Sequence, residues 1–158
     1  MNDFEKLIQL HEDFACTWLA FNASRHDADD LIVSVEARLR LEREQNAARV
    51  AELERTAADS GRSETVRRVA TGELAKFQKC KFAATPEEIA AFAELVREQE
   101  RALLDLQKIQ TEFLEAFNKA GQHLKNIRAD VLGHKSLPVA PNWITGQQAK
   151  FAKLCEEV

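Results

Sequence analysis

Residues that interrupt helices are scarce in this sequence, which has five glycines and three prolines among 158 residues. Tyrosine, a residue enriched in β-strands, is absent. β-Branched residues never gather into the alternating apolar and polar run that marks a half-buried strand. Long stretches consist instead of Ala, Leu, Glu, Lys, Arg and Gln, which are strong helix formers. The composition therefore argues against a β-rich fold and predicts an all-α protein.

Cysteine is scarce as well. Cys16, Cys80 and Cys155 are odd in number and far apart, which indicates reduced thiols in a cytoplasmic protein rather than a disulfide framework. The N-terminal stretch carries acidic residues where a signal peptide needs a basic start. No apolar run approaches the roughly 20 residues of a membrane span. We expect a cytoplasmic protein that makes no contact with a membrane.

An excess of positive charge is also missing, because the formal net charge is −4 at pH 7. A general nucleic-acid binder is expected to carry a basic stripe, so the balance of charge argues against that class. Apolar residues make up 45% of the chain and charged residues 30%. This balance suits a folded helical protein and argues against wholesale disorder.

Apolar residues recur at steps of three and four, the spacing of amphipathic helices. The predicted helices span residues 3–22, 30–58, 63–82, 85–132 and, in a short fifth helix, 146–157. The polar stretch between the first two helices is predicted to be a loop, in which Asp27 or Asp29 caps the second helix.

The helix predicted over 85–132 has the clearest signals. Thr85 and Glu88 match a capping box, and a proline occupies the first helical position between them. The positions predicted to form the packing surface of this helix, which we call its seam, then advance by 3.5 residues on average, the heptad value of coiled coils. They are Ile89, Phe92, Val96, Gln99, Leu103, Leu106, Gln110, Phe113, Phe117, Ala120, Leu124, Ile127 and Val131. At 1.5 Å per residue the helix is about 70 Å long, so we expect it to be the spine of an elongated bundle. The helix over 63–82 is expected to run antiparallel to its first half, and self-association of the long helix is the alternative.

The stretch before the fifth helix contains two prolines, which predict an extended path. Leu137, Trp143 and Ile144 lie in this stretch as candidate anchors for a partner. Folding of the stretch back onto the bundle is the open alternative. The simplest division is a helical bundle over 1–135 followed by an extended segment and short helix over 136–158.

Catalytic, metal and cofactor motifs are absent from the sequence. A carboxylate-bridged di-iron bundle needs Glu-x-x-His on two helices, and none of the four histidines follows a glutamate at that spacing. His26 stands with Asp27, Asp29 and Asp30, but this group lacks the glycine and ligand spacing of an EF-hand, and its binding of a cation stays open. We therefore assign no catalytic, metal-binding or cofactor-binding residue.

Three functions remain. The leading hypothesis is a non-enzymatic protein–protein interaction module, such as an adaptor, assembly subunit or chaperone-like factor, that binds another protein or a second copy of itself. Its candidate contact residues are Trp143, Ile144, Leu137, Gln99 and Gln110. The first alternative is a nucleic-acid-associated regulator that uses the basic stretch 62–81. Its candidate contact residues are Arg62, Arg67, Arg68, Lys76 and Lys79. The second alternative is an accessory subunit of an enzyme or a metal-binding helical bundle.

Overall fold

A computed structural model describes residues 2–120 and 140–156, and within these ranges the chain forms helices and no strand. The helices are α1 (Asp3–Ala58), α2 (Glu64–Gln78), α3 (Pro86–Ala120) and α5 (Ala140–Cys155). The prediction of an all-α, elongated bundle is confirmed.

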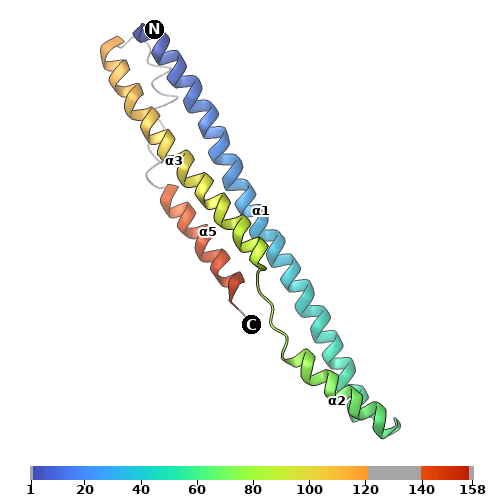
Figure 1. The fold of residues 1–158 in the computed structure, drawn as a ribbon. Coiled ribbons are helices and arrows are strands. Elements are labelled where there is room, and N and C mark those ends of the chain that lie inside the picture. Colours follow the sequence, from blue (N-terminus) through green and yellow to red (C-terminus); the bar gives the residue numbers. More distant parts are fainter. Residues whose placement is uncertain (1, 121–139, 157–158) are drawn as a thin grey trace.

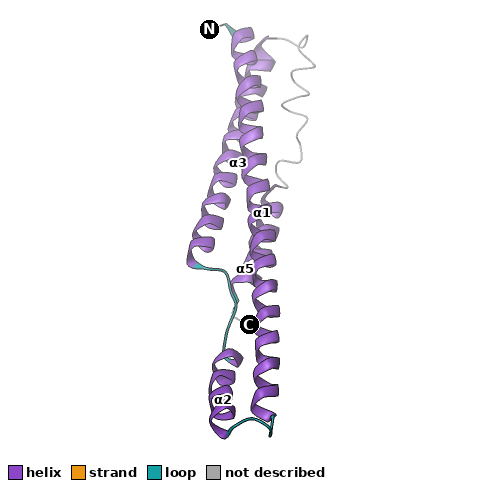
Figure 2. Ribbon diagram, turned by 90° about the vertical axis from the view of Figure 1, so that its right-hand side faces the viewer, coloured by secondary structure: helices purple, strands orange, loops and turns teal. Residues whose placement is uncertain are grey.

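The spine of the molecule is α1, and not the helix predicted over 85–132. α1 has 56 residues and is therefore about 84 Å long. Figure 1 shows α3 antiparallel to the first half of α1, while α2 folds back along the last turns of α1. Figure 2 shows α2 and α3 following one another along α1, joined by the extended residues 79–85. The predicted packing of the 63–82 helix against the start of the long helix is therefore wrong, because α2 packs on α1.

The loop predicted over residues 22–30 is also wrong, because α1 continues through it without a break. Phe21, Ser24, Ala28 and Ile32 are buried at steps of three and four, so the helical periodicity persists beneath the polar residues. No glycine or proline interrupts the stretch. Burial against the neighbouring helices outweighs the low helix propensity of its aspartates and asparagine.

The ends of the helices are set by local side chains. Asn2 and Glu5 form a capping box at the start of α1, with Glu5 N donating to Asn2 Oδ1 at 2.8 Å. Ser63 caps α2 by accepting a hydrogen bond from a backbone N–H. The capping box predicted for α3 is present: Glu88 N donates to Thr85 Oγ1 at 3.1 Å, and Thr85 N donates to Glu88 Oε1 at 2.8 Å.

The predicted seam of the long helix is buried along most of its described length. Its members Phe92, Val96, Gln99, Leu103, Leu106, Phe113 and Phe117 are each at most 6% exposed. Ile89, at the first turn of α3, is 43% exposed, and Gln110 is half-buried. The continuation of this helix over 121–132, with the last seam positions, lies outside the described residues.

Two buried clusters hold α1, α3 and α5 together. The first joins the N-terminal half of α1 to the C-terminal half of α3 and includes Leu7, Phe14, Leu106 and Phe113. The second lies near the middle of the rod, where α1, α3 and α5 meet. No described residue of α5 belongs to the first cluster.

The C-terminal helix begins earlier than predicted. α5 starts at Ala140, so residues 140–144 are helical and the extended path predicted for them is wrong. Pro141 is the second residue of α5, where a missing backbone N–H leaves no intrahelical hydrogen bond unmade. Leu137 and the earlier part of the predicted extended stretch lie outside the described residues. The division of the chain at residue 135 stays a prediction.

Candidate interaction surfaces

The start of α3 is tied to α1 through Arg38. Its guanidinium donates hydrogen bonds to both carboxylate oxygens of Glu88, to Glu42 Oε1 at 2.9 Å, and to the carbonyl of Ala83 at 3.5 Å. Glu88 is also the capping-box residue of α3, so one carboxylate both begins the helix and fixes it to the spine. The hydrogen bonds from Arg38 to Glu88 and Glu42 raise the pKa of the guanidinium above its ordinary value.

The pKa of the Glu88 carboxyl lies below its ordinary value of 4.5. Burial acts against this shift by disfavouring the charged form, but the N–H groups of Thr85 and Arg38 outweigh it. A carboxyl with a lowered pKa stabilises the fold fully above its unfolded pKa, and this contribution is lost as the pH falls through the folded value.

We expect Glu88→Gln to lower the free energy of unfolding by about 1 kcal/mol near pH 7, because a charge-assisted pair and part of a cap are lost. The difference from the wild type should shrink as the pH falls from 4.5, the ordinary value, through the lower pKa of Glu88 in the folded chain. Urea unfolding followed by circular dichroism at pH 7 and at steps below pH 4.5 measures both effects. Glu87→Gln is the control. Glu87 is exposed, and its substitution removes the same charge from the same turn of α3. A Glu88→Gln difference that stays constant with pH contradicts this role for the ion pair.

A second site is the groove between α1 and α3 that α5 occupies. Gln99 is fully buried, and its Nε2 donates to Gln147 Oε1 on α5 at 2.8 Å. The Nε2 of Gln147 lies 3.1 Å from the carbonyl of Arg25 and 3.0 Å from Asp29 Oδ1. The polar position in the seam of α3 is therefore matched by a polar position on α5, so this pair fixes the register of the two helices.

The candidate partner contacts fall into different environments. Ile144 is 4% exposed and packs into the second cluster, so it and Gln99 are in contact with the chain itself. Trp143 is 40% exposed, and the Arg25 guanidinium lies 3.3 Å from the centroid of its ring. Gln110 is half-buried. The binding of a partner by these residues stays a prediction, and Trp143 is the most exposed of those that the structure describes.

The far end of the rod is a two-helix projection, which we call the distal arm: residues 41–58 of α1 and all of α2. Within these two ranges Leu53 and Ala70 are the buried side chains. Cross-contacts include Arg49 Nη2 to Glu73 Oε2 at 3.3 Å and Asn46 Nδ2 to the carbonyl of Phe77 at 3.2 Å. The arm therefore has a thin core held partly by polar contacts.

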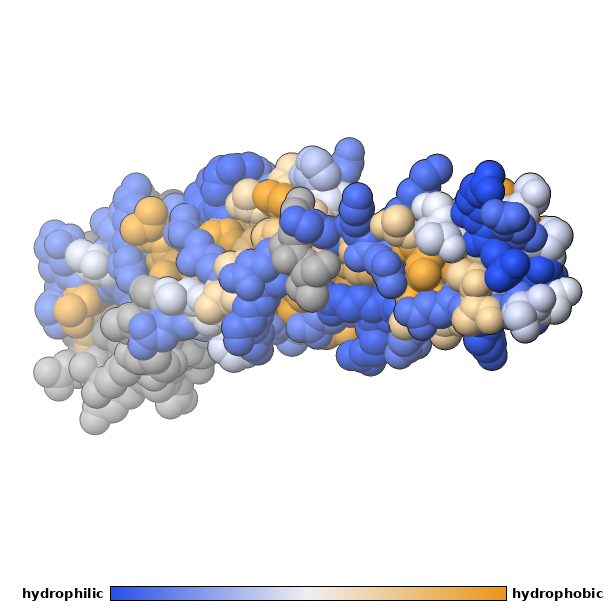
Figure 3. Space-filling view, turned by 90° about the horizontal axis from the view of Figure 1, so that it is seen from below, coloured by the Kyte–Doolittle hydropathy of each residue, from blue (hydrophilic) through white to orange (hydrophobic). Residues whose placement is uncertain are grey.

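Large apolar side chains remain exposed on the distal arm. Leu41 is 54% exposed, Val66 40% and Val69 58%. Figure 3 shows that apolar patches on the face it presents are separated by hydrophilic residues along the rod. Val66 and Val69 share one side of α2 with Glu73 and Lys76, since these positions recur at steps of three and four.

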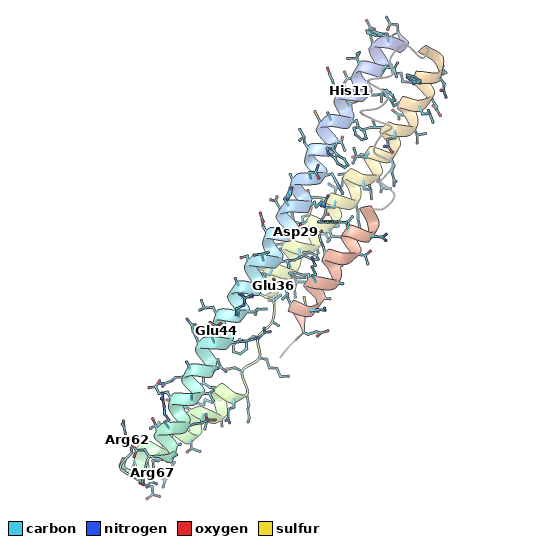
Figure 4. All side chains as sticks on the ribbon, turned by 180° about the vertical axis from the view of Figure 1, so that it is seen from behind. His11, Asp29, Glu36, Glu44, Arg62 and Arg67 are labelled. Carbon is cyan, nitrogen blue, oxygen red and sulfur yellow. The ribbon has the colours of Figure 1, made fainter. Side chains whose placement is uncertain are left out.

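Of the basic residues predicted to contact nucleic acid, Arg67, Arg68 and Lys76 lie on α2 in the distal arm, and Arg62 and Lys79 flank α2. Arg62 and Arg67 are at the tip of the arm (Figure 4). Arg62 pairs with Asp59 at 3.6 Å and Arg68 with Glu64 at 3.1 Å, whereas Lys76 and Lys79 are exposed. The nucleic-acid alternative stays a prediction.

The candidate cation group lies within the continuous helix α1 and not in a loop. Among the described residues no three His, Cys, Asp or Glu side chains are grouped so that they can hold a metal ion. His26, Asp27, Asp29 and Asp30 belong to consecutive turns of one helix, and Asp29 accepts a hydrogen bond from Gln147. Cation binding by this group has therefore no support from the geometry.

Two residues that matter for these sites were not predicted from the sequence. Arg38 lies three residues after the buried Val35, but its partner Glu88 is 50 positions away, and no local pattern connects them. Gln147 was missed because the helix was predicted to start at 146. In a helix that starts at Ala140, Gln147 lies one helical step of three residues after Ile144, and both side chains are buried.

Within residues 2–120 and 140–156, no helix is long and apolar enough to cross a membrane. Comparison of the chain with protein-family models, with curated proteins and with solved structures finds no match.

Proposed function

We propose that this chain is a non-enzymatic protein–protein interaction module, such as an adaptor or assembly subunit, whose distal arm binds a helix of a partner protein. The observation that carries the proposal is the exposed pair Val66 and Val69 on an arm with a thin core. Because α1 is continuous, the arm projects beyond α3 as an extension of the spine. A third helix packed beside α2 removes this apolar surface from water, which favours binding.

The charge of α2 and its flanks indicates the chemistry of the partner. Residues 62–81 contain six basic and two acidic side chains, although the whole chain has a net charge of −4. The basic set is Arg62, Arg67, Arg68, Lys76, Lys79 and Lys81, and the acidic set is Glu64 and Glu73. A partner helix with an apolar stripe flanked by Asp and Glu is complementary to this surface.

Site-specific photo-crosslinking tests the proposal. A benzophenone amino acid replaces Val69 in one full-length chain and Val33, which is 63% exposed on α1, in a control chain. Each chain is irradiated in extract of the source organism, and the crosslinked peptides are sequenced by mass spectrometry. We expect Val69 to capture an amphipathic segment with an excess of Asp and Glu that Val33 does not capture.

The charge requirement is tested in the same chain. Lys76→Glu with Lys79→Glu should reduce the Val69 adduct several-fold, and raising the salt concentration should reduce it as well. Capture of a basic segment, of a second copy of the chain or of nucleic acid contradicts the proposed partner. Equal adducts from Val33 and Val69 contradict the proposed surface.

A further inference from the structure

We propose that the groove beneath α5 is a second binding site, a receptor for an amphipathic helix of a partner protein, and that α5 masks it. The floor of the groove consists of Ile32 and Val35 from α1 with Phe92, Val96 and Gln99 from α3. This site is separate from the distal arm and does not depend on it.

Two side chains of α5 are buried in the groove, and Leu154 and Cys155 pack partly buried against the same cluster. The two buried side chains, Ile144 and Phe151, are 4% and 3% exposed, and they lie seven residues apart, which is about two helical turns. The rings of Phe151 and Phe92 are stacked, with centroids 4.1 Å apart and an interplanar angle of 11°. A helix with an aliphatic residue and an aromatic residue at this spacing can therefore fill the same two positions.

The polar fit is incomplete. Gln147 lies between the two apolar anchors and accepts a hydrogen bond from Gln99 Nε2. The Oε1 of Gln99 is buried and has no hydrogen-bond partner among the residues that the structure describes. A buried acceptor without a donor is unfavourable, so α5 leaves one group of the groove unsatisfied. A partner helix that supplies a donor at this point satisfies the groove better than the resident helix does.

Release of α5 leaves much of the scaffold intact. The first buried cluster, which joins α1 to α3, includes no described residue of α5. Contacts of α5 outside the groove include a backbone hydrogen bond from Ala84 N to Leu154 O at 2.7 Å and the contact of Trp143 with Arg25. The opposite side of α5, with Gly146, Ala149 and Lys153, faces solvent. α5 therefore resembles a bound ligand that is tethered to its own receptor.

The chemistry of the groove defines the partner. It is a helix with an aliphatic residue, a side chain three positions later that both accepts from and donates to Gln99, and an aromatic residue four positions after that. In α5 the corresponding residues are Ile144, Gln147 and Phe151, of which Gln147 accepts a hydrogen bond from Gln99 but does not donate one to it. Because α5 belongs to the same chain, it competes with such a helix intramolecularly, so the site is masked while α5 is docked.

A labelled peptide with the sequence of residues 140–156 tests the masking. Its binding is measured by fluorescence anisotropy to the full-length wild type, to Phe151→Asp and to Phe151→Asp combined with Val96→Asp. The first substitution releases the resident helix, and the second disrupts the groove. We expect the peptide to bind Phe151→Asp at least tenfold more tightly than the wild type, and to lose this binding when Val96 is also replaced.

A second peptide, with Gln147→Leu, tests the polar part of the site. It should bind the released chain at least tenfold more weakly, because Gln99 then has no partner in the groove. Circular dichroism shows whether each variant keeps its helices, and Phe151→Ala is measured beside Phe151→Asp as a milder release. Equal binding to wild type and both released chains overturns the masking. If the peptide of residues 140–156 does not bind a Phe151 variant that keeps its helices, the proposal of a receptor site is overturned.

Discussion

Phe113→Ala is expected to lower the free energy of unfolding by about 3–5 kcal/mol, the usual range when a buried phenylalanine is truncated to alanine. Phe113 is 0% exposed and belongs to the buried cluster that joins α1 and α3. Its ring lies 6.3 Å from that of Phe117, one turn along the same seam. Truncation leaves a cavity between two long helices that have few other ways to close it.

The adjacent residue provides a matched control. Leu114 follows Phe113 in the same turn of α3 but is 42% exposed. Leu114→Ala should therefore change the free energy of unfolding by about 0.5 kcal/mol or less. Urea unfolding at 25 °C compares the two variants, and Phe113→Leu, which leaves a smaller cavity, should fall between them. Similar losses for Phe113→Ala and Leu114→Ala contradict the seam as the contact between α1 and α3.

The seam of α3 and its capping box were predictable because they depend on neighbouring residues. A heptad step places Leu103, Leu106 and Phe113 on one side of any helix, whatever that helix packs against. Thr85 and Glu88 are three positions apart, so their reciprocal hydrogen bonds form within one turn. Predictions of this kind need no knowledge of the tertiary structure.

The error at residues 22–30 shows the limit of local reasoning. The aspartates and asparagine of this stretch favour caps and loops in isolation. In the folded chain Phe21 and Ala28 are buried at helical spacing, and Asp29 pairs with Gln147 from α5. Burial against distant helices decides the local structure here, and such partners are not visible in a single sequence.

The prediction that the helix over 85–132 is the spine was wrong for a related reason. Two predicted helices, 3–22 and 30–58, are in fact one helix, which makes α1 longer than α3. Once α1 is continuous, α2 and α3 each have a stretch of it to pack against, and they need not pack on each other. The pair of Arg38 with Glu88 then becomes understandable, because it fixes the point on the spine where α3 begins.

The continuity of α1 also matters for function. A bend or loop near residue 26 would bring the distal arm back toward α3 and bury its exposed side chains. A straight α1 instead keeps Val66 and Val69 at the far end of the rod, away from the groove that α5 occupies. The two proposed sites are then separate and can bind different partners at the same time.

A distance measured along α1 tests the continuity of this helix most directly. Glu12 and Ala48 are both exposed and lie 36 residues apart, which is ten turns, so they are on the same side of a continuous helix. Spin labels at these two positions, in a chain whose Cys16 and Cys80 are replaced by serine and Cys155 by alanine, report their separation by double electron–electron resonance. A single continuous helix predicts a distance of about 54 Å. Two helices folded against each other at residues 22–30 place the labels about 20 Å apart, and a distance in that range contradicts the spine.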